Sequence, residues 1–317
     1  MLVKIPVGAK VIKLSKFRKA TPEIVSLRTK ENTRTNAVNV QPRTNQTDSL
    51  SEDIEQELED REEEECEDDG FSYFHSPEVE EVLDEYGYFV GFTHYRHPDV
   101  ALVIERTTNE VMEILKFVKN GSRELDNLTH LTEKDSPHNH AIRPIRSWTV
   151  EGGTMVSLPY AGSNVMDLKD ITKNLWGVAC QLFEAVNFLH ENKIVHLDLK
   201  PENLMIPDSY GRLTIIDFEM SVRMLAGTFC RGRVGSEGYM APEMVNGLYY
   251  DPFKADLFSC GVVIVKLCGK SRLSIDKEIL LAIANCLINP EPTKRPTSLI
   301  SNKHMFSQRF RPVLASV

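Results

Sequence analysis

The 317-residue sequence lacks a long apolar run and any paired cysteine motif. Even the apolar stretch at residues 261–266 is interrupted by a lysine, whereas a transmembrane helix needs roughly 20 consecutive apolar residues. The six cysteines are scattered without a C-x-x-C pair, as is typical of a reduced protein rather than a disulfide scaffold. The sequence therefore predicts no transmembrane segment and an intracellular protein, cytoplasmic or nuclear.

The first 70 residues lack the aromatic and apolar content of a folded domain. Residues 1–50 are rich in Lys, Arg, Asn and Thr, and residues 52–69 are mostly Asp and Glu, which decides the sign of the net charge of −9. We expect residues 1–70 to be disordered, because they cannot bury enough apolar surface. In one functional alternative the basic start, which has no compact apolar core of a signal peptide, is a targeting or membrane-surface segment. In another, the acidic run binds a basic partner or folds back on the basic arm.

From residue 71 the composition becomes that of a globular protein. Apolar alternation predicts strands at residues 88–92, 100–104 and 111–118 and twice within 141–160. Helical spacing is found at residues 123–131, 171–191, 253–268 and 277–288. This pattern predicts an α+β fold with two lobes. Residues 71–160 form a small antiparallel sheet with one helix, residues 161–311 form a larger, mainly helical lobe, and residues 312–317 form a tail.

The segment H-L-D-L-K-P-E-N, residues 196–203, carries the side chains that phosphoryl transfer requires. Such a reaction needs a carboxylate to orient the attacking hydroxyl, a cation for the γ-phosphate and oxygen ligands for metal ions. Asp198, Lys200 and Asn203 supply these groups from one short loop. Asp217 ends an apolar strand soon afterwards, and hard oxygen ligands suit Mg²⁺. The sequence therefore predicts ATP and Mg²⁺ as cofactors.

Three more motifs follow in order: G-S-E-G-Y-M-A-P-E, A-D-L-F-S-C-G and N-P-E-P-T-K-R-P-T. With the two segments above, they resemble the eukaryotic protein kinase superfamily across residues 86–311. The resemblance implies Asp198 as catalytic base, Lys200 as γ-phosphate contact, and Asn203 and Asp217 as metal ligands. It also implies three structural roles. His196 and Phe218 make a packed column with Leu128. Glu243 and Arg295 form a buried ion pair, and Asp256 anchors the catalytic loop.

The resemblance also predicts the substrate and the nucleotide site. D-L-K-P-E-N and Ser236 on the substrate-facing loop favour Ser/Thr over Tyr kinases, so a protein substrate is expected and nucleic acid is not. On the third predicted strand, Lys116 is the lysine expected to contact the α- and β-phosphates, with Lys119 as an alternative. Ile114 on the same strand stands where the family usually has Ala. The residues expected to bind ATP are Lys116, Glu124, Gly91, Leu158, Pro159, Tyr160, Ala161 and Met205.

The sequence departs from the family pattern in the phosphate-binding loop. Gly91 is the one glycine in residues 90–98, where the family has G-x-G-x-x-G, so the pattern does not account for phosphate cover. His94, Arg96 and His97 are interpreted as surface residues, and cationic contacts from one of them to the phosphates are the alternative.

Further departures lie in the second lobe. Leu197 replaces an Arg that commonly holds a phosphorylated activation loop, so we expect activity without phosphorylation of that loop. Glu219 replaces the Gly of D-F-G and adds a carboxylate near the metals. The family's helix G region is shortened to residues 271–276.

Three functions stay open on these residues. The first is a Ser/Thr protein kinase. The second is a pseudokinase that binds nucleotide or acts as a scaffold, which the single glycine, Ile114 and Glu219 favour. The third is a small-molecule kinase of the choline or aminoglycoside type, because such enzymes can carry an acidic residue after the metal-binding Asp.

Overall fold

The computed structural model describes residues 73–94, 97–207 and 211–299. Every described residue belongs to one compact unit of the chain, which spans residues 72–317. The predictions for residues 1–70 and for the tail at 312–317 therefore lie outside the described residues. In the part that is described, no helix is both long and apolar enough to cross a membrane.

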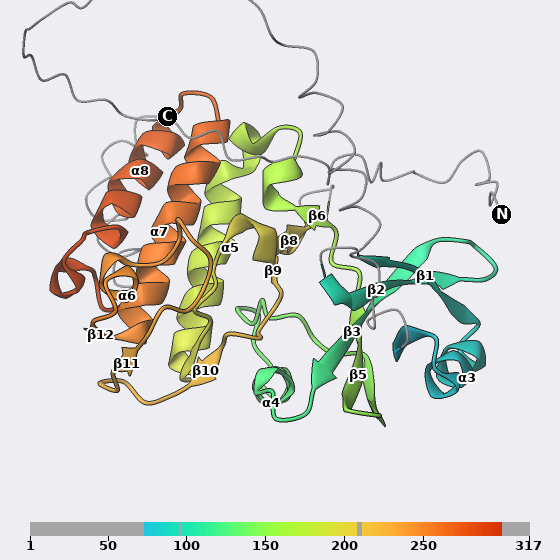
Figure 1. Ribbon diagram of the computed structural model, residues 1–317. Helices are drawn as coiled ribbons and strands as arrows, with labels where there is room; N and C mark the ends of the chain where they lie inside the picture. The colour runs from blue at the N-terminus through green and yellow to red at the C-terminus, as the bar shows by residue number, and fades with distance from the viewer. Residues whose placement is uncertain (1–72, 95–96, 208–210, 300–317) are drawn as a thin grey trace, which may run out of the picture. The chain divides into compact units, whose positions relative to one another are not determined.

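A five-stranded antiparallel sheet forms the first half of the described chain (Figure 1). Its strands, in spatial order, are β1 (Tyr88–His94), β2 (His97–Glu105), β3 (Val111–Lys119), β5 (Gly153–Pro159) and β4 (Arg146–Val150). All the predicted strands are confirmed. Because successive side chains on a strand face opposite sides, Ile114 and Lys116 share one face of β3, while Leu115 and Phe117 point into the core on the other.

Two helices accompany this sheet, where the sequence predicted one. The expected helix is α4 (Glu124–Thr132), and the additional one is α3 (Pro77–Glu85). The signal for α3 was a proline at its first position and Val79 and Leu83 at i, i+4 spacing. Both apolar side chains are buried against the sheet together with Phe74, so α3 covers its outer face.

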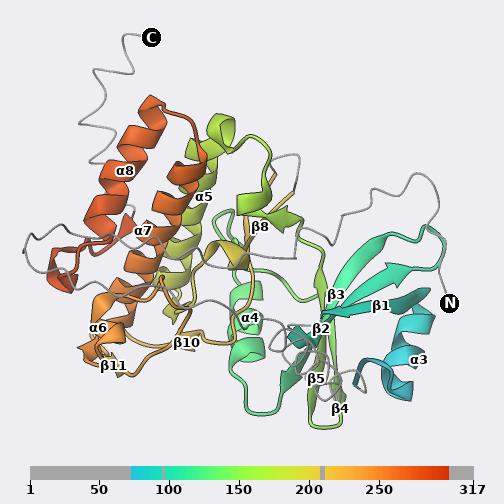
Figure 2. The same cartoon turned by 45° about the horizontal axis from the view of Figure 1, so that its top comes forward.

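The second half of the chain is built around three long helices. They are α5 (Ile171–Glu191), α7 (Pro252–Lys270) and α8 (Ile275–Leu287). These helices pack on one another in all three pairings and lie side by side in Figures 1 and 2. Their facing sides hold the largest apolar core. Residues 271–274 alone join α7 to α8, as the short helix G region predicted.

Short strands and turns hold the loops that surround the catalytic motifs. Two-residue strands pair as β7 (Ile194–Val195) with β10 (Val222–Arg223) and as β11 (Cys230–Arg231) with β12 (Tyr249–Tyr250). A small sheet joins β6 (Ser163–Asn164), β8 (Leu204–Ile206) and β9 (Thr214–Ile215). The remaining short elements are the 3₁₀ turns η2 (Val165–Asp167), η3 (Pro201–Asn203) and η4 (Pro292–Lys294) and the helix α6 (Pro242–Val245). The segment 196–203 therefore begins directly after β7 and ends in η3, so both of its ends are held by secondary structure.

Candidate active site

The backbone of the loop 196–200 is fixed by a carboxylate from α7. Asp256 is fully buried, and its two oxygens accept hydrogen bonds from the backbone N–H groups of His196 and Leu197, both at 2.8 Å. The ring Nε2 of His190 on α5 lies 3.1 Å from one of the same oxygens. Leu197 has a left-handed backbone with φ of 63°, a conformation that costs free energy for a non-glycine residue and is held here by these bonds.

Asp198 is oriented by both of its carboxylate oxygens. Lys200 Nζ donates to Oδ2 at 2.7 Å and also to the hydroxyl of Ser236 at 2.7 Å. The backbone N–H of Ser236 donates to Oδ1 at 2.7 Å. Gly235 makes this approach possible, because its φ is +98° and a Cβ atom there would collide with the carbonyl oxygen of Leu197. The structure thus brings the predicted base, the predicted phosphate contact and the predicted substrate-facing residue together.

Asn203 and Asp217 are brought to the same side of the loop. The Asn203 side chain donates to the backbone carbonyl of Asp198 at 2.9 Å, and the backbone carbonyl of Asn203 accepts from the N–H of Ile216, the residue before Asp217, at 3.0 Å. Within the described ranges no three His, Cys, Asp or Glu side chains converge to hold a metal ion. Asn203 and Asp217 carry an amide oxygen and a carboxylate, the hard oxygen ligands that divalent cations accept beside phosphates and water.

Lys116 connects the sheet to the catalytic segment. Its Nζ donates to Glu124 Oε1 at 2.8 Å and to Asp217 Oδ1 at 3.0 Å, although only 8 % of the residue is exposed. Burial alone would lower the pKa of Lys116, but the two carboxylates outweigh it and raise the pKa above its ordinary value. Burial would likewise raise the pKa of Asp217, and Lys116 holds it below its usual range. Lys119, the alternative, is exposed at the end of β3.

An apolar column stands beside this ion-paired group. Phe218 is fully buried, and its ring centroid lies 4.9 Å from that of His196 in an edge-to-face arrangement. Leu128 of α4 is buried in the same core cluster as Phe218. The next residue, Glu219, is exposed. The aromatic ring thus keeps Asp217 next to the catalytic loop, and Glu219 points away from the core.

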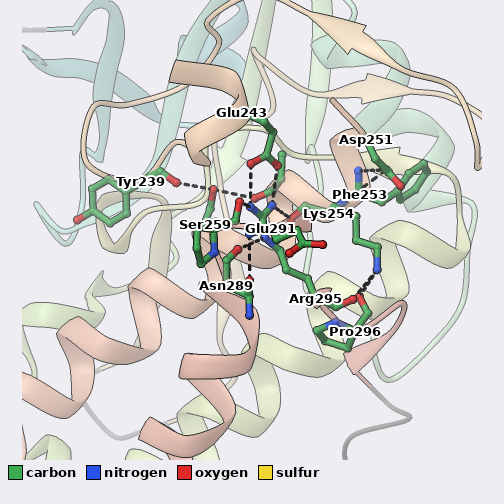
Figure 3. A network of polar contacts seen from close by, with 12 residues as sticks. Tyr239, Glu243, Asp251, Phe253, Lys254, Ser259, Asn289, Glu291, Arg295 and Pro296 are labelled. Carbon is green, nitrogen blue, oxygen red and sulfur yellow. Dashed lines mark hydrogen bonds and ion pairs between the residues drawn. The ribbon is translucent and has the colours of Figure 1, made fainter. Parts of the chain in front are cut away.

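Farther from the loop, Glu243 and Arg295 form the expected buried ion pair (Figure 3). Two guanidinium nitrogens of Arg295 contact the two oxygens of Glu243 at 2.6 and 2.7 Å. The remaining donors of Arg295 reach the carbonyls of Asn289 and Lys254 at 2.7 and 3.0 Å. The pair joins α6, which follows the activation segment (residues 219–241), to the loop after α8, so it fixes the end of that segment.

Comparison with known proteins adds a decisive observation. The model of the family described as "Protein kinase domain" matches residues 99–302, more than half of the chain. The chain belongs to the protein kinase family. Helix α3 and strand β1 lie before the matched residues.

Three curated relatives are similar to part of this kinase chain. "SNF1-like protein kinase ssp2" of Schizosaccharomyces pombe is 36% identical over 149 residues, which is 45% of this chain and 25% of that protein. "Carbon catabolite-derepressing protein kinase" of Candida tropicalis is 41% identical over 110 residues, or 34% and 17% of the two chains. The protein of the same name from Saccharomyces cerevisiae is 43% identical over 99 residues, or 31% and 15%. The match thus spans a quarter or less of each relative.

The predicted hinge, the segment of residues 158–162 expected to bind the adenine, runs from β5 into β6. Leu158 is buried directly across from Ile114 of β3, so the large Ile114 side chain packs beside it. Pro159, Tyr160 and Ala161 follow, all partly exposed, and line a hollow of about 740 Å³ with the loop 135–143. Met205 of β8 pairs with Asn164 of β6, which follows the hinge.

Gly91 lies inside β1 rather than in a loop. A Cβ atom at this position would collide with the Ile104 side chain of β2, and the strand register shifts between Val90 and Phe92. This glycine is therefore required for packing of β1 on β2. The side chains of His94, Arg96 and His97, the alternative phosphate contacts, lie outside the described residues.

Leu197 is anchored by apolar contacts. It is 6 % exposed and belongs to a cluster with Val195, Ala241, Met244 and Tyr250, which lie on β7, α6 and β12 and in the loop before α6. Val222, Met224, Cys230 and Val234 of the activation segment pack on this cluster. Apolar contacts thus hold this segment beside Leu197.

Sequence reasoning missed two residues that position the site. Asn127 on α4 donates to the hydroxyl of Ser221 at 2.8 Å and so ties this helix to the segment after Asp217. It lies three residues after Glu124 and therefore on the same helix face, a spacing that was visible in the sequence. The second, His190, had no such signal, because its partner Asp256 is 66 residues away.

Proposed function

We propose that this chain is a Ser/Thr protein kinase that transfers the γ-phosphoryl group of ATP, with Mg²⁺, to hydroxyl groups of protein substrates. The observation that carries the proposal is the bond of 3.0 Å between Lys116 and Asp217, because it joins the sheet to the carboxylate that follows β9. This contact supports a site in which a phosphate-binding cation and a metal ligand lie together. The free cysteines of the described ranges agree with an intracellular location.

Each group has a definite part in the reaction. Asp198 accepts the proton of the substrate hydroxyl, whose oxygen then bonds to the γ-phosphorus while the bond to the β–γ bridging oxygen breaks and ADP leaves. Lys200 lies beside Asp198 and balances charge on the transferred group. Lys116 contacts the other phosphates. Asn203 and Asp217 would hold the metal ion, which neutralises charge on the phosphate oxygens when bound.

The pseudokinase alternative rests on the degenerate glycine loop. Gly91 lies within a strand and packs on β2, so this glycine does not form a loop whose backbone N–H groups could cover the phosphates. Against that alternative, Lys116 is already paired with Glu124, and Asp198 is oriented at both oxygens. Such preorganised groups favour catalysis over simple binding.

The experiment compares purified wild-type chain with Asp198→Asn in Mg·ATP and a general protein substrate. Removal of the base is expected to reduce phosphate transfer by about 10²–10⁴-fold. The variant should still bind ATP in a thermal-shift measurement. Equal incorporation by both proteins would refute the kinase proposal, and ATP consumption with small alcohols or amines alone would favour a small-molecule kinase.

Phosphatase treatment is expected to leave the activity unchanged. The activation segment is held by apolar contacts around Leu197, so it does not need a phosphate to stay in place. The measurement is the initial rate before and after treatment, with mass spectrometry to verify that residues 219–241 carry no phosphate. A large loss of rate that is restored by rephosphorylation would contradict this expectation.

A further inference from the structure

A basic hollow lies at the end of the helical lobe where α5 begins and α7 ends. Its volume is about 350 Å³, and three cationic side chains line it, those of Lys169, Lys270 and Arg272. One acidic side chain, Asp170, also lines it. Asp170 pairs with Lys173 at 3.1 Å, so its charge is already compensated. The hollow therefore carries an excess of positive charge.

Two of the three cations are available to a ligand. Lys169 and Arg272 are exposed, and within the described ranges neither side chain forms an ion pair. The third, Lys270, donates to the carbonyl of Met166. The first turn of α8 holds Asp276 and Glu278, but neither lines the hollow. Anionic groups would thus meet at least two free cations here.

Two large apolar side chains stand next to these cations. Leu273 is 80% exposed and Ile275 is 60% exposed, the former in the short connection between α7 and α8 and the latter at the start of α8. The backbone N–H of Arg272 donates to the hydroxyl of Thr172 at 3.0 Å, which holds this connection against α5. Neighbouring apolar side chains at such exposure, bordered by charged groups, are characteristic of interaction surfaces.

This surface is connected to the catalytic loop through hydrogen bonds. Lys270 contacts Met166 in η2, and the side chain of Asn164, just before η2, donates to the carbonyl of Pro201 at 2.7 Å. Pro201 directly follows Lys200. A protein held at the hollow would therefore be bound to the same framework that carries the phosphoryl-transfer groups.

We propose that Lys169, Lys270, Arg272, Leu273 and Ile275 form a docking surface for an acidic segment of protein substrates that also carries apolar side chains. Carboxylate or phosphate groups of the segment occupy the hollow, and its apolar side chains cover Leu273 and Ile275. Charge complementarity selects this occupant, because the free groups of the hollow are cationic. The inference rests on the proposed kinase function and adds a substrate class to it.

The test uses the full chain and a fluorescein-labelled synthetic peptide that alternates leucine and glutamate. Fluorescence anisotropy should show binding that weakens with salt and is lost when glutamine replaces glutamate. The double variants Lys169→Glu/Arg272→Glu and Leu273→Ser/Ile275→Ser should each weaken it by about fivefold or more. Arg143→Glu, a charge reversal at an exposed arginine on the hollow behind the hinge, is the matched control and should bind as wild type does.

Two further measurements identify the preferred anionic group and test whether docking affects catalysis. A peptide with phosphoserine in place of glutamate that binds more tightly supports phosphate as the preferred group, and equal or weaker binding supports carboxylate. Fusing the leucine–glutamate segment to a protein substrate should lower KM and leave kcat unchanged in wild type only.

Three results would overturn the inference: no binding of either anionic peptide, equal binding of the glutamine peptide, or unaltered binding by both double variants. Asp198→Asn should bind the peptide as wild type does. Binding without any phosphate transfer would refute the proposed function alone, and transfer without binding would refute the docking surface alone.

Discussion

The variant Lys116→Met is expected to lose phosphate transfer by about a hundredfold or more, because one preorganised cationic donor is removed from the nucleotide's phosphates. Lys116 also connects Glu124 to Asp217, with bonds of 2.8 and 3.0 Å. Without it, two carboxylates would face each other without a cation between them. The loss should therefore appear both as weaker ATP binding and as a lower kcat.

Lys119→Met is the matched control for this variant. Lys119 lies on the same strand but is exposed, so its removal should leave the rate near that of wild type. The measurement is kcat and KM for ATP of both variants, with thermal unfolding to verify that each is folded. A result in which Lys119→Met loses activity and Lys116→Met keeps it would assign the nucleotide lysine to the other position.

The largest effect on stability is expected from Glu243→Ala. The guanidinium of Arg295 is fully buried and pairs with Glu243 through two bonds (Figure 3). Removal of one partner leaves a buried charge without compensation, which costs about 3–5 kcal/mol of the free energy of unfolding. Since single domains are stabilised by only about 5–15 kcal/mol, such a loss should be visible as a large drop in the denaturation midpoint.

Urea denaturation of matched variants tests this expectation. Glu291→Ala removes an exposed glutamate that pairs with Lys294 on the surface, and its midpoint should stay close to wild type. Glu243→Met/Arg295→Met removes both buried charges and should recover much of the lost stability. If Glu243→Ala were no less stable than Glu243→Met/Arg295→Met, the unpaired charge of Arg295 would not be the cause of the lost stability.

The parts of the site that are predictable from sequence are those carried by short segments. Asp198, Lys200 and Asn203 lie within six residues, so the loop that brings them together is local. The strands and long helices followed from apolar periodicity, which the burial of their side chains explains. The contact between Lys116 and Asp217 was not visible in the sequence, because it joins residues 101 positions apart.

What the sequence did not reveal depends on packing between distant segments. Helix α3 has only two core side chains, Val79 and Leu83, so its periodicity is short and easily overlooked. The structural need for Gly91 arises from Ile104 on the neighbouring strand. The docking surface likewise depends on α5 and the α7–α8 connection, which are about 100 residues apart and meet only in the folded chain.

The apolar anchoring around Leu197 has a thermodynamic consequence. Contacts between charges weaken as salt screens them, whereas burial of apolar surface is little affected by moderate ionic strength and loses strength on cooling. The activation segment is held by Val195, Ala241, Met244 and Tyr250 around Leu197. Its order should therefore withstand changes in salt and decrease in the cold, so that temperature rather than a phosphate donor sets how much of the kinase has this segment in place.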